Sequence, residues 1–251
     1  MRIVFLAVDD EFAGSMQRVV YANYPSWVVG SVISTCSIYR KSPLEAFWFV
    51  LRKSGFRYGA EMFRMKIIRR LSGRGPTTTP TRLANDHYVP VHYCADINAE
   101  QSLQQLTDWK PDIVVATNFS HIVGQQARKI AKHGTWNMHK SYLPHFRGMA
   151  PSFFALLNGS EQTGVTLHEI EKGIDTGNII RQIPIEILPS DTVYSLNQKT
   201  AEAGGRLLSD IVGGENLNAL ESTPQPAGDW PYYTFPSPQD VRRFLDLGLR
   251  F

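Results

Sequence analysis

The feature of this sequence that most restricts its fold is the alternation of short β-branched runs with longer amphipathic stretches. The run at 112–117 is almost continuously apolar, which is typical of a central strand covered on both faces. Stretches of helical period separate it from similar runs on either side. A parallel sheet with crossover helices produces this alternation. We therefore predict an α/β fold with a doubly wound, mostly parallel sheet.

The same pattern gives the expected elements in order. Asp9 or Asp10 should cap the first helix and Asn98 the helix at 99–109, because these side chains accept hydrogen bonds from free backbone N–H groups. Strands are expected at 2–8, 27–35, 89–93, 112–117, 134–139, 163–170 and 178–186. Helices are expected at 12–23, 99–109, 124–132, 151–157 and 192–213.

Length and composition set the class of protein. The 251 residues, 43% hydrophobic and 20% charged, suffice for one core and an appendage, which we place at 1–190 and 191–251, the latter a helix and an aromatic tail. The net charge of +3 is too small to indicate nucleic acid. The two cysteines, Cys36 and Cys94, form no disulfide or zinc motif. The apolar run at 2–8 is too short for a membrane span or a signal peptide, so a cytoplasmic location is expected.

Residues 44–75 interrupt the alternation with eight basic and only two acidic side chains. We expect two basic amphipathic helices, split near Gly55 and Gly59, and then a loop to Pro80, so that the insertion occupies about 44–80. The insertion could attract a phosphate-bearing substrate or an anionic surface. The favoured alternative is a solvated helical face that packs its aromatic side on the domain or on another subunit. Aromatic clusters near Trp48 and Trp230 would suit a homodimer.

Three polar residues between glycines and prolines resemble a reaction centre. Asn137 and His139 are two positions apart at the end of a predicted strand, so their side chains should project from the same face. The carboxyl ends of parallel strands are where doubly wound sheets bind ligands. An amide and an imidazolium placed there can hydrogen-bond an oxygen that gains negative charge. Asp175, in a glycine-rich turn, could orient the imidazole and stabilise its charged form.

These residues belong to a longer pattern. It consists of Asn137-x-His139-x-Ser141-x-Leu143-Pro144-x-x-Arg147-Gly148, Thr163-Gly164-Val165-Thr166 and Asp175-Thr176-Gly177. The pattern resembles the folate-dependent formyltransferase family, which includes methionyl-tRNA, glycinamide ribonucleotide and sugar N-formyltransferases. The similarity covers about residues 1–190 and is densest at 110–186.

The resemblance implies a Rossmann-like domain that passes the formyl group of N10-formyltetrahydrofolate to a primary amine, without a metal. On this basis His139 and Asn137 would hold the formyl oxygen, and Asp175 would pair with His139 and assist proton transfer. Arg147 and His168 are weaker candidates for substrate contacts. A salt bridge within the loop is an equally plausible role for Arg147, and a hydrogen-bonded structural role is favoured for His168. Residues of two loops would contact the pterin, and several of these could instead belong to the core: Phe119, His121, Ile122, Val123, Lys172 and Ile174.

Departures from the family pattern narrow the expected acceptor. The loop at 8–14 carries three carboxylates, which are a poor cradle for the phosphate of a glycinamide ribonucleotide. The segment 191–251 is shorter than the C-terminal domain with which the methionyl-tRNA enzymes help to hold tRNA. Nucleic acid is therefore an unlikely partner. A nucleotide-linked amino sugar is the expected acceptor, which makes the chain most like a sugar N-formyltransferase. Lys140 stands where relatives usually have proline or a small residue, and the sequence assigns it no role.

Three alternatives to an enzyme that formylates a nucleotide-linked amino sugar stay open. The acceptor could be an amino-acid or peptide precursor of a natural product, because the same three residues would serve it. A methionyl-tRNA formyltransferase-like enzyme is a further alternative. The chain could also be a non-catalytic folate- or nucleotide-binding module. The intact Asn137, His139 and Asp175 argue against that last alternative.

Overall fold

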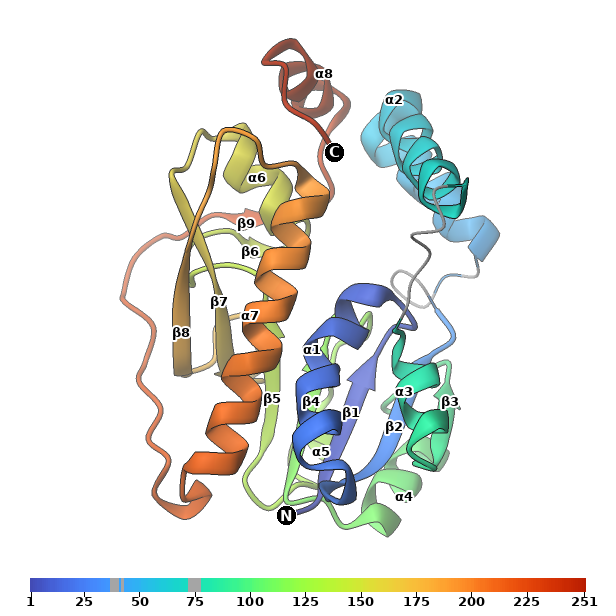
Figure 1. Cartoon of the computed structure of the whole chain (residues 1–251), viewed down its shortest axis with the longest axis vertical. Coiled ribbons are helices and arrows are strands. Elements are labelled where there is room, and N and C mark those ends of the chain that lie inside the picture. The colour runs from blue at the N-terminus through green and yellow to red at the C-terminus, as the bar shows by residue number, and fades with distance from the viewer. Residues whose placement is uncertain (37–40, 42, 72–77) are drawn as a thin grey trace.

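A computed structural model describes residues 1–36, 41, 43–71 and 78–251. Its centre is a seven-stranded sheet in the order β3-β2-β1-β4-β5-β7-β8 (Figure 1). Neighbouring strands from β3 to β5 are parallel, whereas β7 is antiparallel to both β5 and β8. The predicted mostly parallel α/β fold is therefore confirmed. The strands are β1 (Ile3–Ala7), β2 (Val28–Ser34), β3 (Val91–Cys94), β4 (Ile113–Thr117), β5 (Thr135–His139), β7 (Gln162–Glu169) and β8 (Ile179–Glu186).

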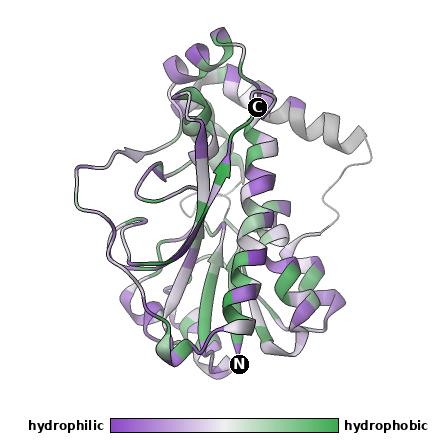
Figure 2. Cartoon of the chain, turned by 60° about the vertical axis from the view of Figure 1, so that its left-hand side comes forward, coloured by the Kyte–Doolittle hydropathy of each residue, from purple (hydrophilic) through white to green (hydrophobic). Residues whose placement is uncertain are grey.

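Helices cover both faces of this sheet. On one face pack α1 (Glu11–Asn23), α3 (Pro80–Asp86) and α7 (Val193–Gly214), whose buried side chains join those of the strands in one core cluster. On the other face α4 (Glu100–Trp109) and α5 (Gln125–Arg128) close a second cluster. Figure 2 shows hydrophobic residues along the strands between these layers. Burial on both faces is the physical reason why β1 and β4 are apolar throughout.

A third cluster lies beyond the sheet, where α6 (Pro151–Leu157) and α8 (Pro238–Asp246) pack with the C-terminal Phe251. The long helix α2 (Pro43–Leu71) contacts α8 there (Figure 1). It breaks at Gly55, whose φ of 81° lies in the region that glycine adopts most readily. The predicted split at Gly55 is thus present, whereas Gly59 continues the helix.

Some expectations for local structure were wrong. The N-cap of α4 is Ala99, because the Asn98 side chain instead accepts from the Gly124 N–H and donates to the Ile122 carbonyl. Helix α5 ends at Arg128, short of the predicted 132. Asp10 does cap α1, with its carboxylate accepting from Ala13 N–H. Of the loop expected up to Pro80, residues 72–77 lie outside the described residues, and Pro80 itself begins α3.

Several short elements had no counterpart in the prediction. Strand β6 (Arg147–Gly148) pairs in parallel with β9 (Tyr232–Tyr233) from the C-terminal region. Helices α3 and α8 and the 3-10 turns η1 (Pro25–Trp27) and η2 (Leu217–Ala219) were also not predicted. Among the described residues, no helix combines the length and the apolarity that a membrane crossing requires.

Candidate active site

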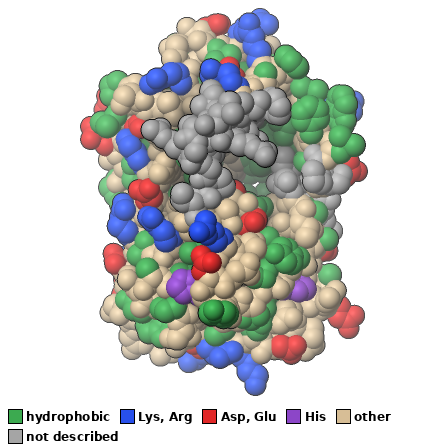
Figure 3. All heavy atoms as spheres, turned by 45° about the vertical axis from the view of Figure 1, so that its right-hand side comes forward, with side chains coloured by type: hydrophobic (Ala, Val, Ile, Leu, Met, Phe, Trp, Pro, Cys, Tyr) green, Lys and Arg blue, Asp and Glu red, His purple; other side chains and the backbone are tan. Residues whose placement is uncertain are grey.

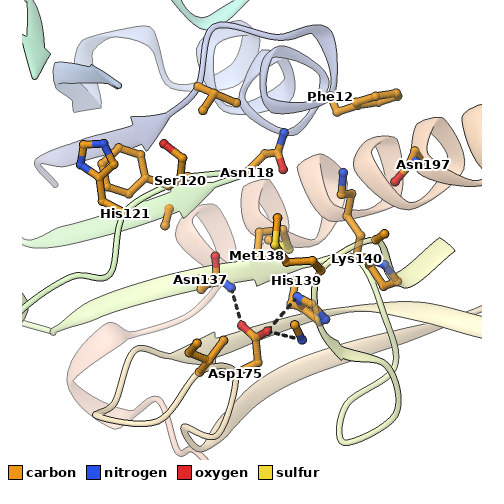
Figure 4. A pocket seen from close by; sticks show the side chains of 18 of the residues that line it. Phe12, Asn118, Ser120, His121, Asn137, Met138, His139, Lys140, Asp175 and Asn197 are labelled. Atoms are coloured by element: carbon orange, nitrogen blue, oxygen red, sulfur yellow. Dashed lines mark hydrogen bonds and ion pairs between the residues drawn. The ribbon is translucent and has the colours of Figure 1, made fainter. Parts of the chain in front are cut away.

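A cavity of about 1120 Å³ opens at the carboxyl ends of β1, β4 and β5 (Figure 4). Its walls come from the loops that follow these strands, from the loop at 170–175 and from the N-terminal ends of α1, α6 and α7. Of the predicted site residues, all but Arg147 line it: Asn137, His139, Asp175, Phe119, His121, Ile122, Val123, Lys172, Ile174 and His168.

Strand β5 places Asn137 and His139 on the same side, and both reach Asp175. The Asn137 Nδ2 donates to Asp175 Oδ1 at 3.3 Å, and His139 Nδ1 lies 3.5 Å from Asp175 Oδ2. His168 stands opposite Asn137 in the antiparallel register of β5 and β7. Its Nε2 lies 3.1 Å from Asn137 Nδ2 and 3.6 Å from Asp175 Oδ1. An amide and two imidazoles therefore surround one carboxylate, and Figure 4 shows Asn137 and His139 directed at Asp175.

A backbone N–H and a side-chain amide from distant segments hold the Asp175 loop in place. Asp175 has a φ of 52°, and its Oδ2 accepts a hydrogen bond of 2.9 Å from the Gly148 N–H. The Gln225 side chain donates to the carbonyls of Asp175 and Gly177, at 2.8 and 2.9 Å. A Cβ atom on Gly177 would lie 1.8 Å from the Glu169 carbonyl oxygen, so only glycine fits there.

The loop after β5 is fastened by the polar residues of the sequence pattern. Thr166 Oγ1 donates to the Ser141 carbonyl at 2.7 Å and accepts from the Leu143 N–H at 3.1 Å. The Ser141 hydroxyl donates to the His145 carbonyl at 2.7 Å. The fastened loop brings the Phe146 carbonyl to 3.1 Å from His139 Nε2. The hydrogen bonds of Ser141 and Thr166 thus fix the loop that positions His139, which explains why both residues belong to the sequence pattern.

The charges of the site are coupled. Burial alone would raise the pKa of Asp175, but His139, His168 and the Gly148 N–H hold this pKa well below its ordinary value. Asp175 is therefore a carboxylate at neutral pH. Burial lowers the pKa of His139, while Asp175 and the Phe146 carbonyl act against that shift. An imidazole and an amide that share one carboxylate can hydrogen-bond a developing oxyanion, and the carboxylate can accept a proton.

The predicted pterin-contacting residues fall into two groups. Ile122 and Ile174, 66% and 40% exposed, stand at the cavity with free surface. Val123 is buried in the core cluster that α4 and α5 close, and Phe119 packs against that cluster. His121 braces its loop, because its Nδ1 accepts from the Ile97 N–H and its Nε2 lies 2.8 Å from Ser34 Oγ. Arg147 donates to the Ile174 carbonyl at 3.3 Å, which ties two loops together.

Sequence reasoning missed residues at the end of the cavity formed by α1 and α7. Asn118, Lys140 and Asn197 reach this end together with Phe12 (Figure 4). Lys140 directly follows His139 in the sequence, and this adjacency was the available signal. Asn118 has a φ of 57° and donates to Asp10, which no sequence pattern announces. The described residues contain no group of three or more His, Cys, Asp or Glu side chains arranged to hold a metal ion.

Comparisons with known proteins place this site in context. Residues 77–212 match the family model described as formyl transferase. A methionyl-tRNA formyltransferase of Kosmotoga olearia is 33% identical over 156 residues, which are 61% of this chain and 50% of that protein. One of Stenotrophomonas maltophilia is 37% identical over 142 residues, 56% of this chain and 46% of that protein. The chain thus spans about half the length of these curated relatives.

Solved structures share the fold at low sequence identity. A phosphoribosylglycinamide formyltransferase from Anaplasma phagocytophilum superposes with a TM-score of 0.64 at 18% identity, covering 92% of this chain and 96% of that one. An N-formyltransferase from Helicobacter canadensis, in complex with folinic acid and dTDP-3-aminofucose, gives a TM-score of 0.56 at 20% identity. That match covers 96% of this chain and 72% of the other. The family model spans more than half of the chain, and the chain therefore belongs to the formyl transferase family.

Proposed function

We propose that this protein is an N-formyltransferase that moves the formyl group of N10-formyltetrahydrofolate to a primary amine. The observation that carries the proposal is the convergence of Asn137, His139 and Asp175 in one cavity at the carboxyl edge of the sheet. Membership of the formyl transferase family supports it. A non-catalytic binding module would have no need of a carboxylate buried among an amide and two imidazoles.

Each of the three side chains has a distinct part in the proposed reaction. The amine nitrogen attacks the formyl carbon, and the carbonyl oxygen becomes an oxyanion that Asn137 and His139 stabilise by hydrogen bonds. Asp175, the carboxylate partner of His139, assists the transfer of the proton from the attacking nitrogen. The bond from the formyl carbon to N10 of the folate then breaks, and N10 receives a proton. His168 supports Asn137 and Asp175 from the neighbouring strand.

The folate end of the cavity is assigned to the loops at 118–123 and 170–174. Ile122, Ile174 and Lys172 have exposed surface there, and Phe119 and Val123 form the wall behind them. His121 contributes by holding the first loop to Ser34 and Ile97. The Helicobacter canadensis enzyme is in complex with folinic acid, which supports a folate as the ligand of this cavity.

We infer that the acceptor is a nucleotide-linked amino sugar. The dTDP-3-aminofucose of the Helicobacter canadensis complex supports this class. Methionyl-tRNA is a second candidate, because the curated relatives at 33–37% identity are methionyl-tRNA formyltransferases. The expectation that nucleic acid is an unlikely partner therefore has no support from the comparisons. An amino-acid acceptor and a homodimer stay predictions.

Mass spectrometry of acceptors tests both the reaction and its class. The purified protein is incubated with N10-formyltetrahydrofolate and, separately, with amino-sugar nucleotides, amino-acid conjugates and methionyl-tRNA. We expect one amino-sugar nucleotide to gain the mass of one CO. A gain on methionyl-tRNA alone would replace the sugar proposal with the second candidate. The absence of any gain across the panel, with folate shown to bind, would contradict the proposed function.

A further inference from the structure

Lys140 is a charged residue of the cavity wall that the proposed chemistry leaves unused. It follows β5 and reaches the end of the cavity between α1 and α7 (Figure 4). Its Nζ lies 4.9 Å from the centre of the Phe12 ring. Within the part of the chain that the structure describes, this Nζ has neither a hydrogen-bond acceptor nor an ion-pair partner in contact distance. Its three N–H donors are therefore free for whatever fills the cavity.

The carboxylate of Asp10 acts on the charge of Lys140 while its own hydrogen bonds go to other groups. The Asp10 carboxylate accepts from the Ala13 N–H at 2.8 Å as the cap of α1, and also from the Asn118 amide. Its charge favours the ammonium form of Lys140, whose pKa burial lowers. A lysine that lines the cavity and has no acceptor in contact can donate a hydrogen bond to a ligand that enters the cavity.

The surroundings of Lys140 indicate which ligand atom would accept its hydrogen bond. Asp9, Asp10 and Glu11 line the same end of the cavity, so the local charge is unfavourable for a phosphate or carboxylate. A neutral hydroxyl oxygen avoids this repulsion. Phe12 and Tyr194 pack with ring centres 5.6 Å apart across α1 and α7, and they give the apolar face of a ring a surface to pack on.

We propose that Lys140 determines acceptor specificity by donating a hydrogen bond to a hydroxyl group of a hydroxylated cyclic amine, while the neighbouring aromatic rings pack against the ring of that amine. The inference rests on the proposed formyl transfer and adds to it the acceptor chemistry that this chain selects. Sites built to hydrogen-bond a hydroxyl discriminate strongly against the analogue that lacks it, because their polar group is then left unpaired. Lys140 thus favours the hydroxylated acceptor over its deoxy counterpart.

Two matched amines test this role. Formyl transfer to trans-2-aminocyclohexanol and to cyclohexylamine is measured as tetrahydrofolate release, for the wild type, Lys140→Met and Lys140→Gln. We expect the wild type to prefer the hydroxylated amine by about tenfold or more in kcat/KM, as hydrogen-bonded recognition predicts. Lys140→Met should bring the ratio close to one at an unchanged KM for the folate. Lys140→Gln, which keeps an N–H donor, should restore part of the preference.

The control and the outcomes separate this inference from the proposed function. Lys132→Met removes an exposed lysine at the opposite edge of the sheet and should leave the preference intact. A preference that survives in Lys140→Met would overturn the role of Lys140 while formyl transfer stands. Lack of release from either amine and from the whole acceptor panel would overturn the proposed function instead. A formyl group found on Lys140 itself by peptide mass spectrometry would make it an acceptor and would also overturn the inference.

Discussion

At the scale of single residues, Asp175 collects more of the site's polar contacts than its neighbours do. Its carboxylate meets the Asn137 amide, the rings of His139 and His168 and the Gly148 N–H. Each of these contacts favours the ionised form, and together they outweigh the cost of burying a charge. The lowered pKa keeps the carboxylate charged at neutral pH, so His139 faces an anion there.

Replacing Asp175 by Asn should change how the rate depends on pH. Asp175 raises the pKa of His139 against the lowering caused by burial, so its removal should let that pKa fall further. We expect kcat/KM in Asp175→Asn to drop and its profile to move to lower pH. The profile is measured between about pH 5 and 9, where a shifted histidine titrates. A lower rate with an unmoved profile would contradict the coupling of the two side chains.

Residue-level prediction succeeded where side chains carry the signal and failed where the backbone does. The strand spacing of Asn137 and His139 placed both on one face, as the structure has them. The Phe146 carbonyl and the Gly148 N–H, which contact His139 and Asp175, have no signature in the sequence because every residue offers these groups. The environment of Lys140 depends on α1 and α7, which come together only in the folded chain.

At the scale of elements, loops from different parts of the chain form the site. The Asp175 loop is held from one side by Gln225 and from the other by Gly148, which belongs to the small β6–β9 pair. The C-terminal segment therefore positions a residue some 50 positions earlier in the chain. Hydrogen bonds between segments so far apart in the chain have no local sequence pattern. Strands β6 and β9 were therefore not predicted.

Gln225→Ala should loosen the Asp175 loop without touching the cavity chemistry directly. Loss of the two hydrogen bonds to the Asp175 and Gly177 carbonyls should raise amide hydrogen exchange at 171–177 and lower kcat/KM by about three- to tenfold, the size expected for about 1 kcal/mol of lost positioning. The matched control is Gln104→Ala, whose amide bonds only the exposed Asp108 in α4. Amide exchange rates at 171–177 equal to those of the wild type would contradict the role of Gln225 in holding the Asp175 loop.

Helix prediction was limited by competing uses of polar residues. Asn98 is a residue type that commonly caps helices, but its amide instead bonds the Gly124 N–H and the Ile122 carbonyl in the loop that follows β4. Helix α8 does carry a readable start, because Ser237 and Asp240 form a capping box with Pro238 between them. That signal was overlooked because the region was interpreted as an aromatic tail. Helix α2 exposes several large hydrophobic side chains, namely Leu44, Phe47, Trp48 and Phe56.

At the scale of the whole molecule, the sheet with its two helix layers carries a cap formed by α2, α6, α8 and the C-terminus (Figure 1). Phe244 is fully buried there and stacks on Phe153 of α6 at 4.5 Å between ring centres. Phe251 and Tyr58 join this cluster and also line the cavity. Figure 3 shows that, on one face of the molecule, hydrophobic side chains reach the surface beside lysines and arginines.

Phe244→Ala should destabilise the protein by about 3–5 kcal/mol, because a fully buried aromatic ring is lost and a cavity remains. The free energy of unfolding is measured by urea denaturation followed by tryptophan fluorescence. Leu247→Ala, one turn further along and 58% exposed, is the matched control and should change stability by about 0.5 kcal/mol or less. Equal effects of the two substitutions would show that the cap does not add to the stability of the fold.

In the proposed reaction, His139 acts on the formyl group within the cavity that we propose to bind the folate. The most direct test is formyl transfer by His139→Asn under single-turnover conditions, with folate affinity measured in parallel by fluorescence. We predict a rate at least about 10²-fold below that of the wild type, with folate affinity nearly unchanged, because only stabilisation of the oxyanion is lost. Transfer at the wild-type rate in this variant would contradict the central claim.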